Sequence, residues 1–206
     1  MNVLDDRKLV AASPGRSVTH RRWRARENLP GSPAFCPIVR KTRDSDEAVA
    51  VDVQGLLNDL ALEFGEDVLM RWAVWMRLRA SKSSFEIEGE ADQSNRIQRF
   101  ADVLARCTGD GALPFEHAAL AQLQSEILGR RTTLLQFGIR QSPVFVSEVA
   151  GDQKVVYYVA PPADERHAML AGMTDFWERT QGQSAVMRSA VPAFGFVYIH
   201  PLAEGN

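Results

Sequence analysis

Apolar residues recur three and four residues apart along most of the chain. The series runs from Asp46 to Ala80 and is interrupted at Gly65, so it predicts two helices that break near Gly65. Four further helical stretches are expected: one with Ile97, Phe100, Leu104 and Cys107 on a single face, one over 114–128, one through 169–177 and one from 185 to 199.

A stripe of methionine and tryptophan lies on the second of the two helices before Ala80. Its members are Met70, Trp72, Trp75 and Met76. Stripes of this kind are typical of a protein core and are rarely a cofactor site. We therefore expect these side chains to be buried.

One segment of the chain lacks the helical spacing of apolar residues. Residues 144–159 contain two runs rich in β-branched and aromatic side chains, which flank Ala150, Gly151 and Asp152. Such runs around a short turn predict a β-hairpin. The sequence thus indicates a mainly α fold with one hairpin.

The first 45 residues form a proline-containing arm with little periodicity. They include the basic run RRWRAR, which ends at Arg26. We expect the arm to be extended and partly wrapped on the domain. Five arginines between Arg16 and Arg26 could touch nucleic acid, but one short cluster in a slightly acidic chain is a weak electrostatic footprint. A solvated arm is therefore favoured over a DNA contact.

Composition describes an ordinary folded chain. Its 206 residues fit one domain, or one domain with an appended arm, and a net charge of -2 gives no overall attraction to nucleic acid or anionic membrane. No stretch approaches the roughly 20 apolar residues that span a bilayer, so we expect a cytoplasmic protein with no membrane partner. Cys36 and Cys107 fit no metal-ligand or redox spacing and are interpreted as small apolar residues.

The last seven residues, HPLAEGN, carry the candidate chemistry. His200 can take a proton from an attacking hydroxyl near neutral pH, and Glu204 could hold magnesium alongside phosphate oxygens. Gly205 lets backbone N–H groups approach a phosphate closely. Taken alone, a His-Pro pair after an apolar helix is more often a helix end than a catalytic centre.

The order HPLAEGN resembles the Fic motif, in which His-Pro-Phe is followed by any residue, an acidic residue and Gly-Asn-Gly. Six of the seven positions fit, and Leu202 replaces a phenylalanine that anchors the loop in the core. The resemblance implies that His200 is the general base, that Glu204 is the magnesium ligand and that Gly205 and Asn206 line the nucleotide phosphate pocket.

A second feature lies upstream, in SKSSFEIEGE. Ser84 is followed four residues later by Glu88 and then by Gly89, and residues four apart share one face of a helix. The segment is similar to the Fic inhibitory motif, although by itself the spacing is more typical of a solvated helix end.

The predicted hairpin resembles the flap on which Fic proteins dock a target peptide as an added strand. The inhibitory motif, the hairpin and HPLAEGN thus follow one another in the same order as in the Fic family. The resemblance runs from about Val51 to the end of the chain. The arm over 1–45 lies outside it. The resemblance implies a helical Fic domain that contains a helical region over 46–130, with the inhibitory motif at 84–89, and the start of the Fic core over 131–206, with the flap at 144–159 and a truncated motif at 200–206.

The resemblance implies a protein adenylyltransferase, which transfers AMP from ATP to a serine, threonine or tyrosine hydroxyl of a target protein and uses Mg²⁺. In the family the motif continues with a glycine and two arginines that bind the nucleotide phosphates. Glu88 would pair with the second arginine and keep the γ-phosphate of ATP from seating productively, which makes the enzyme autoinhibited. A polypeptide that ends at Asn206 is expected to be inactive by itself.

Several alternatives stay open at this point. Within the family they are another phosphate transfer and the removal of AMP from a modified target. From another class, the chain could be a nucleotide-sensing regulator whose arginine-rich arm binds DNA. The target protein, the trigger that relieves inhibition and the oligomeric state, including a homodimer, are left undetermined by one sequence.

Overall fold

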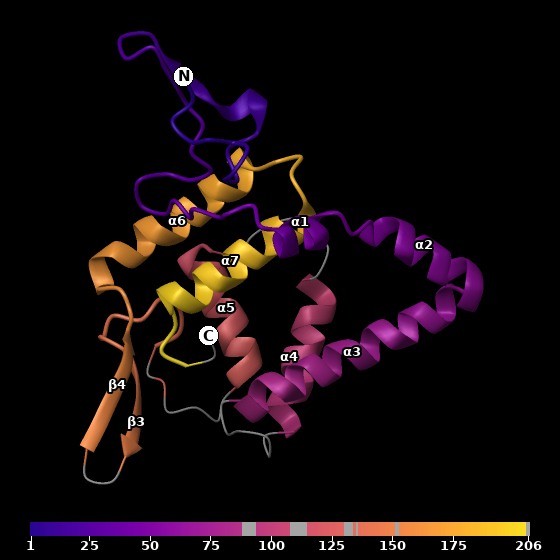
Figure 1. The fold of residues 1–206 in the computed structure, drawn as a ribbon. Helices are drawn as coiled ribbons and strands as arrows, with labels where there is room; N and C mark the ends of the chain where they lie inside the picture. The colour runs from indigo at the N-terminus through magenta and orange to yellow at the C-terminus, as the bar shows by residue number, and fades with distance from the viewer. Residues whose placement is uncertain (88–93, 108–114, 130–133, 135, 151–152, 205–206) are drawn as a thin grey trace. The chain divides into compact units, whose positions relative to one another are not determined.

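Most of the described chain is helical, as the apolar spacing predicts (Figure 1). The computed structural model describes residues 1–87, 94–107, 115–129, 134, 136–150 and 153–204. In these ranges the helices are α1 (Arg43–Val49), α2 (Val53–Phe64), α3 (Glu66–Ile87), α4 (Ser94–Cys107), α5 (His117–Leu128), α6 (Ala163–Arg179) and α7 (Ala185–Ile199). The other elements are the 3₁₀ turn η1 (Pro14–Arg16) and the strands β1 (Val18–His20), β2 (Ala25–Glu27), β3 (Phe145–Ala150) and β4 (Gln153–Val159).

The chain forms two compact units. One comprises 1–51 together with 139–204, and the other comprises 52–138. The N-terminal arm therefore folds with the C-terminal third of the chain. Within the described residues, none of the helices combines the length and the apolar character that a bilayer crossing needs.

The unit formed by residues 52–138 contains α2 to α5. Asp52 caps α2, because its carboxylate accepts a 2.9 Å hydrogen bond from the Gly55 amide. The break predicted near Gly65 is confirmed: Gly65 ends α2 with a φ of 84°, a left-handed value that favours glycine, and α3 begins one residue later.

The buried side of α3 is not its methionine and tryptophan stripe. Ser81 is fully buried, and Phe85 packs against Phe100 of α4 with ring centroids 6.1 Å apart. The stripe residues Met70, Trp72, Trp75 and Met76 are 50–64% exposed, so the expectation that they are core is wrong. The reason is that α3 is apolar on more than one side, and only the side of Ser81 and Phe85 is covered.

Helices α4 and α5 bury a further set of apolar side chains. The predicted face of α4 is right at Ile97, which is buried, but wrong at Cys107, which is exposed at the last residue of the helix. Arg99 closes the end of α5, because its guanidinium donates to the carbonyls of Ile127 and Leu128 at 2.9 and 3.1 Å.

The other unit is built on α6 and α7. Phe176 and Met173 of α6 are fully buried, and Phe176 lies edge-on to Phe35 of the arm with ring centroids 6.5 Å apart. Glycines make this close packing possible. A Cβ at Gly172 or Gly195 would come within 2.7 Å of Phe35.

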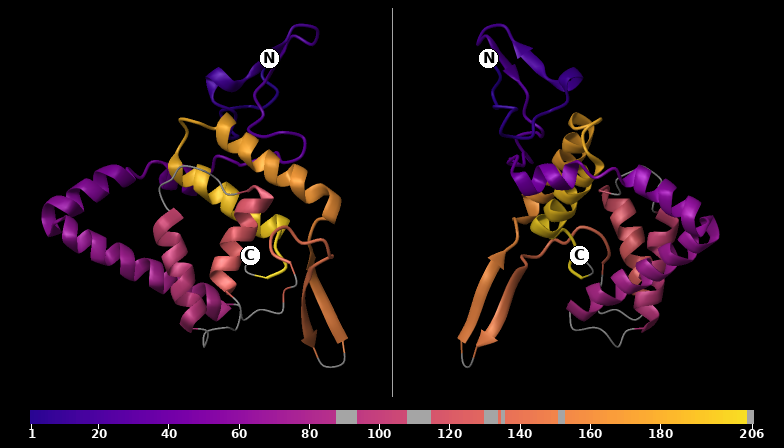
Figure 2. Two further views of the ribbon diagram at one scale, coloured as in Figure 1. Left: turned by 180° about the vertical axis from the view of Figure 1, so that it is seen from behind. Right: turned by 45° about the vertical axis from the view of Figure 1, so that its right-hand side comes forward.

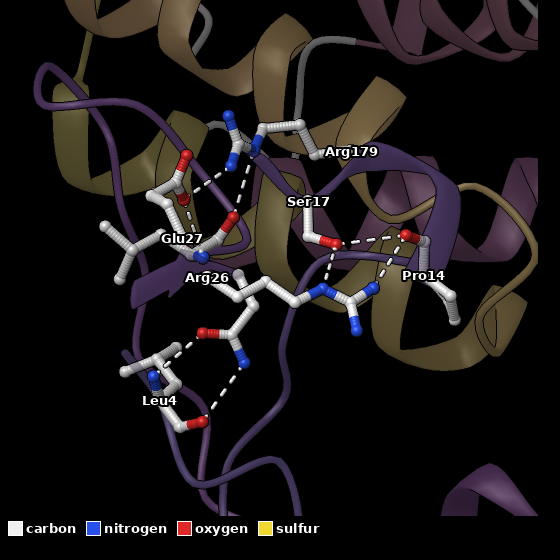
Figure 3. Close-up of polar contacts among 8 residues, drawn as sticks. Leu4, Pro14, Ser17, Arg26, Glu27 and Arg179 are labelled. Carbon is white, nitrogen blue, oxygen red and sulfur yellow. Dashed lines mark hydrogen bonds and ion pairs between the residues drawn. The ribbon is translucent and has the colours of Figure 1, made fainter. Parts of the chain in front are cut away.

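The arm belongs to this unit and has short elements of its own. It contains η1 and the antiparallel β1–β2 hairpin, in which Thr19 pairs with Arg26. Arg179 of α6 fixes the hairpin through an ion pair with Glu27 at 2.6 Å (Figure 3). It also donates to the Leu29 carbonyl at 2.9 Å. These contacts join residues that are far apart in the sequence. The local spacing of apolar residues therefore does not predict them.

The predicted hairpin over 144–159 is confirmed as β3 and β4. Phe145 pairs with Val159, and the register shifts between Val146 and Ser147. The hairpin projects from the start of α6 in each view of Figure 2. Among the described strands, β3 and β4 pair only with each other, so both outer edges of the hairpin lack a further strand.

Candidate functional site

The candidate site begins where α7 ends. His200 is the C-cap residue of α7, with φ 49° and ψ 59°, and its amide donates to the Phe196 carbonyl at 2.9 Å. A left-handed conformation costs a non-glycine residue about 1–2 kcal/mol. The proline at 201 disfavours the right-handed helical conformation for the residue before it, so the helix stops at this point.

Buried residues hold His200 on both sides. Ile199 is fully buried, Pro201 is less than 2% exposed and Leu202 is 4% exposed. Leu202 is therefore buried, as expected for the apolar residue that replaces phenylalanine. The apolar flanks fix the backbone while the His200 side chain remains partly exposed.

The environment of His200 favours its neutral form. Burial lowers the pKa of His200, and the Arg140 guanidinium lowers it further, while a hydrogen bond with the Val197 backbone raises it.

The other residues of the motif are only partly described. Glu204 is half-buried at the end of the described chain. Gly205 and Asn206, predicted to line the phosphate pocket, lie outside the described residues. Among the described residues, no group of three or more His, Cys, Asp or Glu side chains could hold a metal ion. A single carboxylate such as Glu204 nevertheless fits magnesium, which takes most of its ligands from water and phosphate.

The β3–β4 hairpin is attached beside His200. The Tyr158 hydroxyl of β4 donates to the Tyr198 carbonyl, two residues before the histidine, and the two rings lie 5.8 Å apart. Several side chains of the hairpin are exposed, including Val156 at 47% and Tyr157 at 64%. An extended segment could add to either edge of such a hairpin.

The inhibitory motif lies in the other unit. Ser84 is exposed on α3 and its hydroxyl donates to the Ala80 carbonyl at 3.2 Å, so it is helical as expected. Glu88 and Gly89 lie outside the described residues. The pairing of Glu88 with an arginine of the motif stays a prediction.

Sequence reasoning missed Arg140. Its guanidinium donates to the His200 carbonyl at 2.6 Å, although the two residues are 60 positions apart. The acceptor is a backbone group, and no spacing of side chains along the chain could have indicated it. Arg140 is only 4% exposed.

Comparison of the chain with protein-family models, curated proteins and solved structures found no match.

Proposed function

We propose that the protein is a Fic-type adenylyltransferase, which transfers AMP from ATP to a hydroxyl of a target protein. The hydroxyl oxygen forms a bond to the α-phosphorus, the bond between the α-phosphorus and the bridging oxygen breaks, and pyrophosphate leaves. His200 accepts the proton of the attacking hydroxyl.

The single observation that supports this proposal best is the state of His200. A general base must be neutral, partly accessible and fixed in orientation at the operating pH. His200 is partly exposed between buried neighbours, its pKa is lowered by burial and by Arg140, and its backbone is held by the buried residues on both sides. A histidine that only capped α7 would not need these properties together.

The remaining residues of HPLAEGN fit the same reaction. Glu204 would hold Mg²⁺, which neutralises charge on the phosphates of ATP. Gly205 and Asn206 would contribute donors to the phosphate pocket. The target would dock as an added strand on the β3–β4 hairpin. The segment with Ser84, Glu88 and Gly89 would restrain the enzyme, because Glu88 would pair with the arginine that otherwise binds the γ-phosphate of ATP.

Incubation of the full-length protein with Mg²⁺ and ATP tests the proposal. Label on the α-phosphate should appear on protein, label on the γ-phosphate should not, and His200→Ala should abolish transfer. Transfer of the γ-label would indicate another phosphate transfer. Release of AMP from a modified target, without transfer from ATP, would indicate the reverse activity.

The loop of the β1–β2 hairpin supports one alternative, a nucleotide-sensing regulator that binds DNA. Arg21, Arg22 and Arg24 are exposed in this loop, and Trp23 is 72% exposed with the Arg22 guanidinium 5.2 Å from its ring centroid. In the described part of the chain, no carboxylate forms an ion pair with these three arginines. A salt-dependent shift of duplex DNA that is lost in a variant with the three arginines changed to glutamine would favour this alternative.

A further inference from the structure

One residue donates hydrogen bonds to three consecutive carbonyls at the end of α7. Arg140 donates from Nη2 to Ile199 at 3.5 Å, from Nε to His200 at 2.6 Å and from its backbone amide to Pro201 at 2.8 Å. The last carbonyls of a helix have no partner within the helix. Arg140 therefore supplies the bonds that the left-handed turn at His200 would otherwise lack.

The same guanidinium also ties down the base of the β3–β4 hairpin. Its Nη1 donates to the Ser142 carbonyl at 2.6 Å, just before β3, and its Nη2 donates to the Pro161 carbonyl at 3.1 Å, just after β4. One planar side chain thus joins the two ends of the hairpin to the turn that carries His200.

Arg140 is itself held rigidly. Arg166 of α6 is fully buried, and its guanidinium donates to the carbonyls of Arg140 and Ser142. Within the described residues, both guanidinium groups donate to backbone carbonyls and neither forms an ion pair with a carboxylate. Such a fork of carbonyl bonds needs the flat, five-donor guanidinium, because a lysine ammonium cannot reach the separate acceptors at once.

We propose that Arg140 is a positioning residue for the transfer reaction: it holds His200 in its left-handed conformation and fixes the hairpin base to it, so that a hydroxyl docked along the hairpin meets the imidazole. This inference rests on the proposed function. Arg140 touches no reacting atom and acts only through the backbone it binds.

Arg140→Lys keeps the charge and removes the fork. In the full-length protein this variant should lower kcat for AMP transfer by about 10–100-fold, the loss that a small misplacement of a catalytic group produces, while KM for ATP stays unchanged. The φ angle of His200, followed by NMR from the HN–Hα coupling and the Cα chemical shift, should leave the left-handed region.

Arg188→Lys is the matched control. Arg188 lies on the same α7 helix, its Nη2 donates to the Trp177 carbonyl at 2.9 Å and its Nε is buried, but it makes no bond to the turn at His200. This variant should keep kcat and the φ angle of His200 even if it loses stability.

Equal losses of kcat in the two variants, or an unchanged kcat in Arg140→Lys, would overturn the proposal. Should Arg140→Lys fail to fold, Arg140→Gln is measured in the same way, because its amide keeps two planar donors.

The NMR measurement separates this inference from the proposed function. Absence of transfer activity in the Glu88→Gly variant, which lacks the proposed restraint, would refute the function, whereas an unchanged φ in Arg140→Lys would refute positioning by Arg140.

Discussion

The Tyr158 hydroxyl on β4 donates a hydrogen bond to the Tyr198 carbonyl in the last turn of α7. This bond connects the hairpin to the helix end two residues before His200. The hairpin has no other strand to support it among the described residues. Its orientation relative to the histidine therefore depends on a few contacts, which single substitutions can remove.

Tyr158→Phe removes that bond and keeps the ring. We expect a loss of about 0.5–1.5 kcal/mol in the free energy of unfolding and faster amide hydrogen exchange in β3 and β4. Tyr157→Phe is the control, since the Tyr157 hydroxyl bonds only to Glu148 within the hairpin at 2.9 Å. Identical exchange in the two variants would show that the Tyr158 bond does not anchor the hairpin.

The packing of Phe35 predicts unequal effects of alanine at two glycines. A Cβ at Gly172 would meet the Cβ and backbone nitrogen of Phe35 at 2.7 and 2.9 Å, whereas a Cβ at Gly195 would meet the ring edge at 2.7 and 3.0 Å. The ring can rotate away but the backbone cannot. Overpacking costs typically about 1–3 kcal/mol, so Gly172→Ala should destabilise more than Gly195→Ala in urea unfolding. The opposite order would contradict the packing described for Phe35.

The lowered pKa of His200 predicts a pH dependence of stability. The neutral ring is favoured in the folded protein, so the unfolded chain binds a proton more readily. The free energy of unfolding should fall as pH drops below about 6.5, the ordinary histidine value, and level off below the folded pKa. His200→Ala should lose this component. The measurement is a pair of urea titrations across pH 5–8, and parallel curves for the two proteins would refute the shift.

Glu204→Ala tests the magnesium assignment. A half-buried loop carboxylate contributes little packing, so the variant should fold like the wild type. Metal-dependent AMP transfer by the full-length protein should nevertheless be lost, because Glu204 is the proposed ligand. Transfer that is unchanged at millimolar Mg²⁺ would exclude this role for Glu204.

The periodic part of the fold could be predicted from the sequence. The break at Gly65, the helices that end at Leu128 and Ile199 and the β3–β4 hairpin follow from local spacing and turn residues. Spacing alone could not tell which apolar side of α3 is covered. It placed Trp72 and Trp75 in a core, where the structure leaves both half-exposed.

The site was predictable only where its residues are adjacent in sequence. His200 and Glu204 lie within one short motif. A histidine and a carboxylate indicate a proton acceptor and a metal ligand by their residue types alone. Arg140 and Arg166 act through backbone carbonyls distant in the chain, and a carbonyl is common to every residue. Nothing in the residue types around 140 therefore marks that position.

We propose that this chain carries the base and the restraint of an AMP transfer enzyme. The most direct test of this proposal is labelling of the full-length protein and its Glu88→Gly variant with α-labelled ATP and Mg²⁺, alongside the Glu88→Gly/His200→Ala double variant. The account predicts that Glu88→Gly raises labelling well above the wild-type level, because the phosphate-binding arginine is released, and that the double variant carries no label. Labelling of the double variant would show that His200 is not the base, and labelling unchanged by Glu88→Gly would show that the segment after Ser84 is only a helix end.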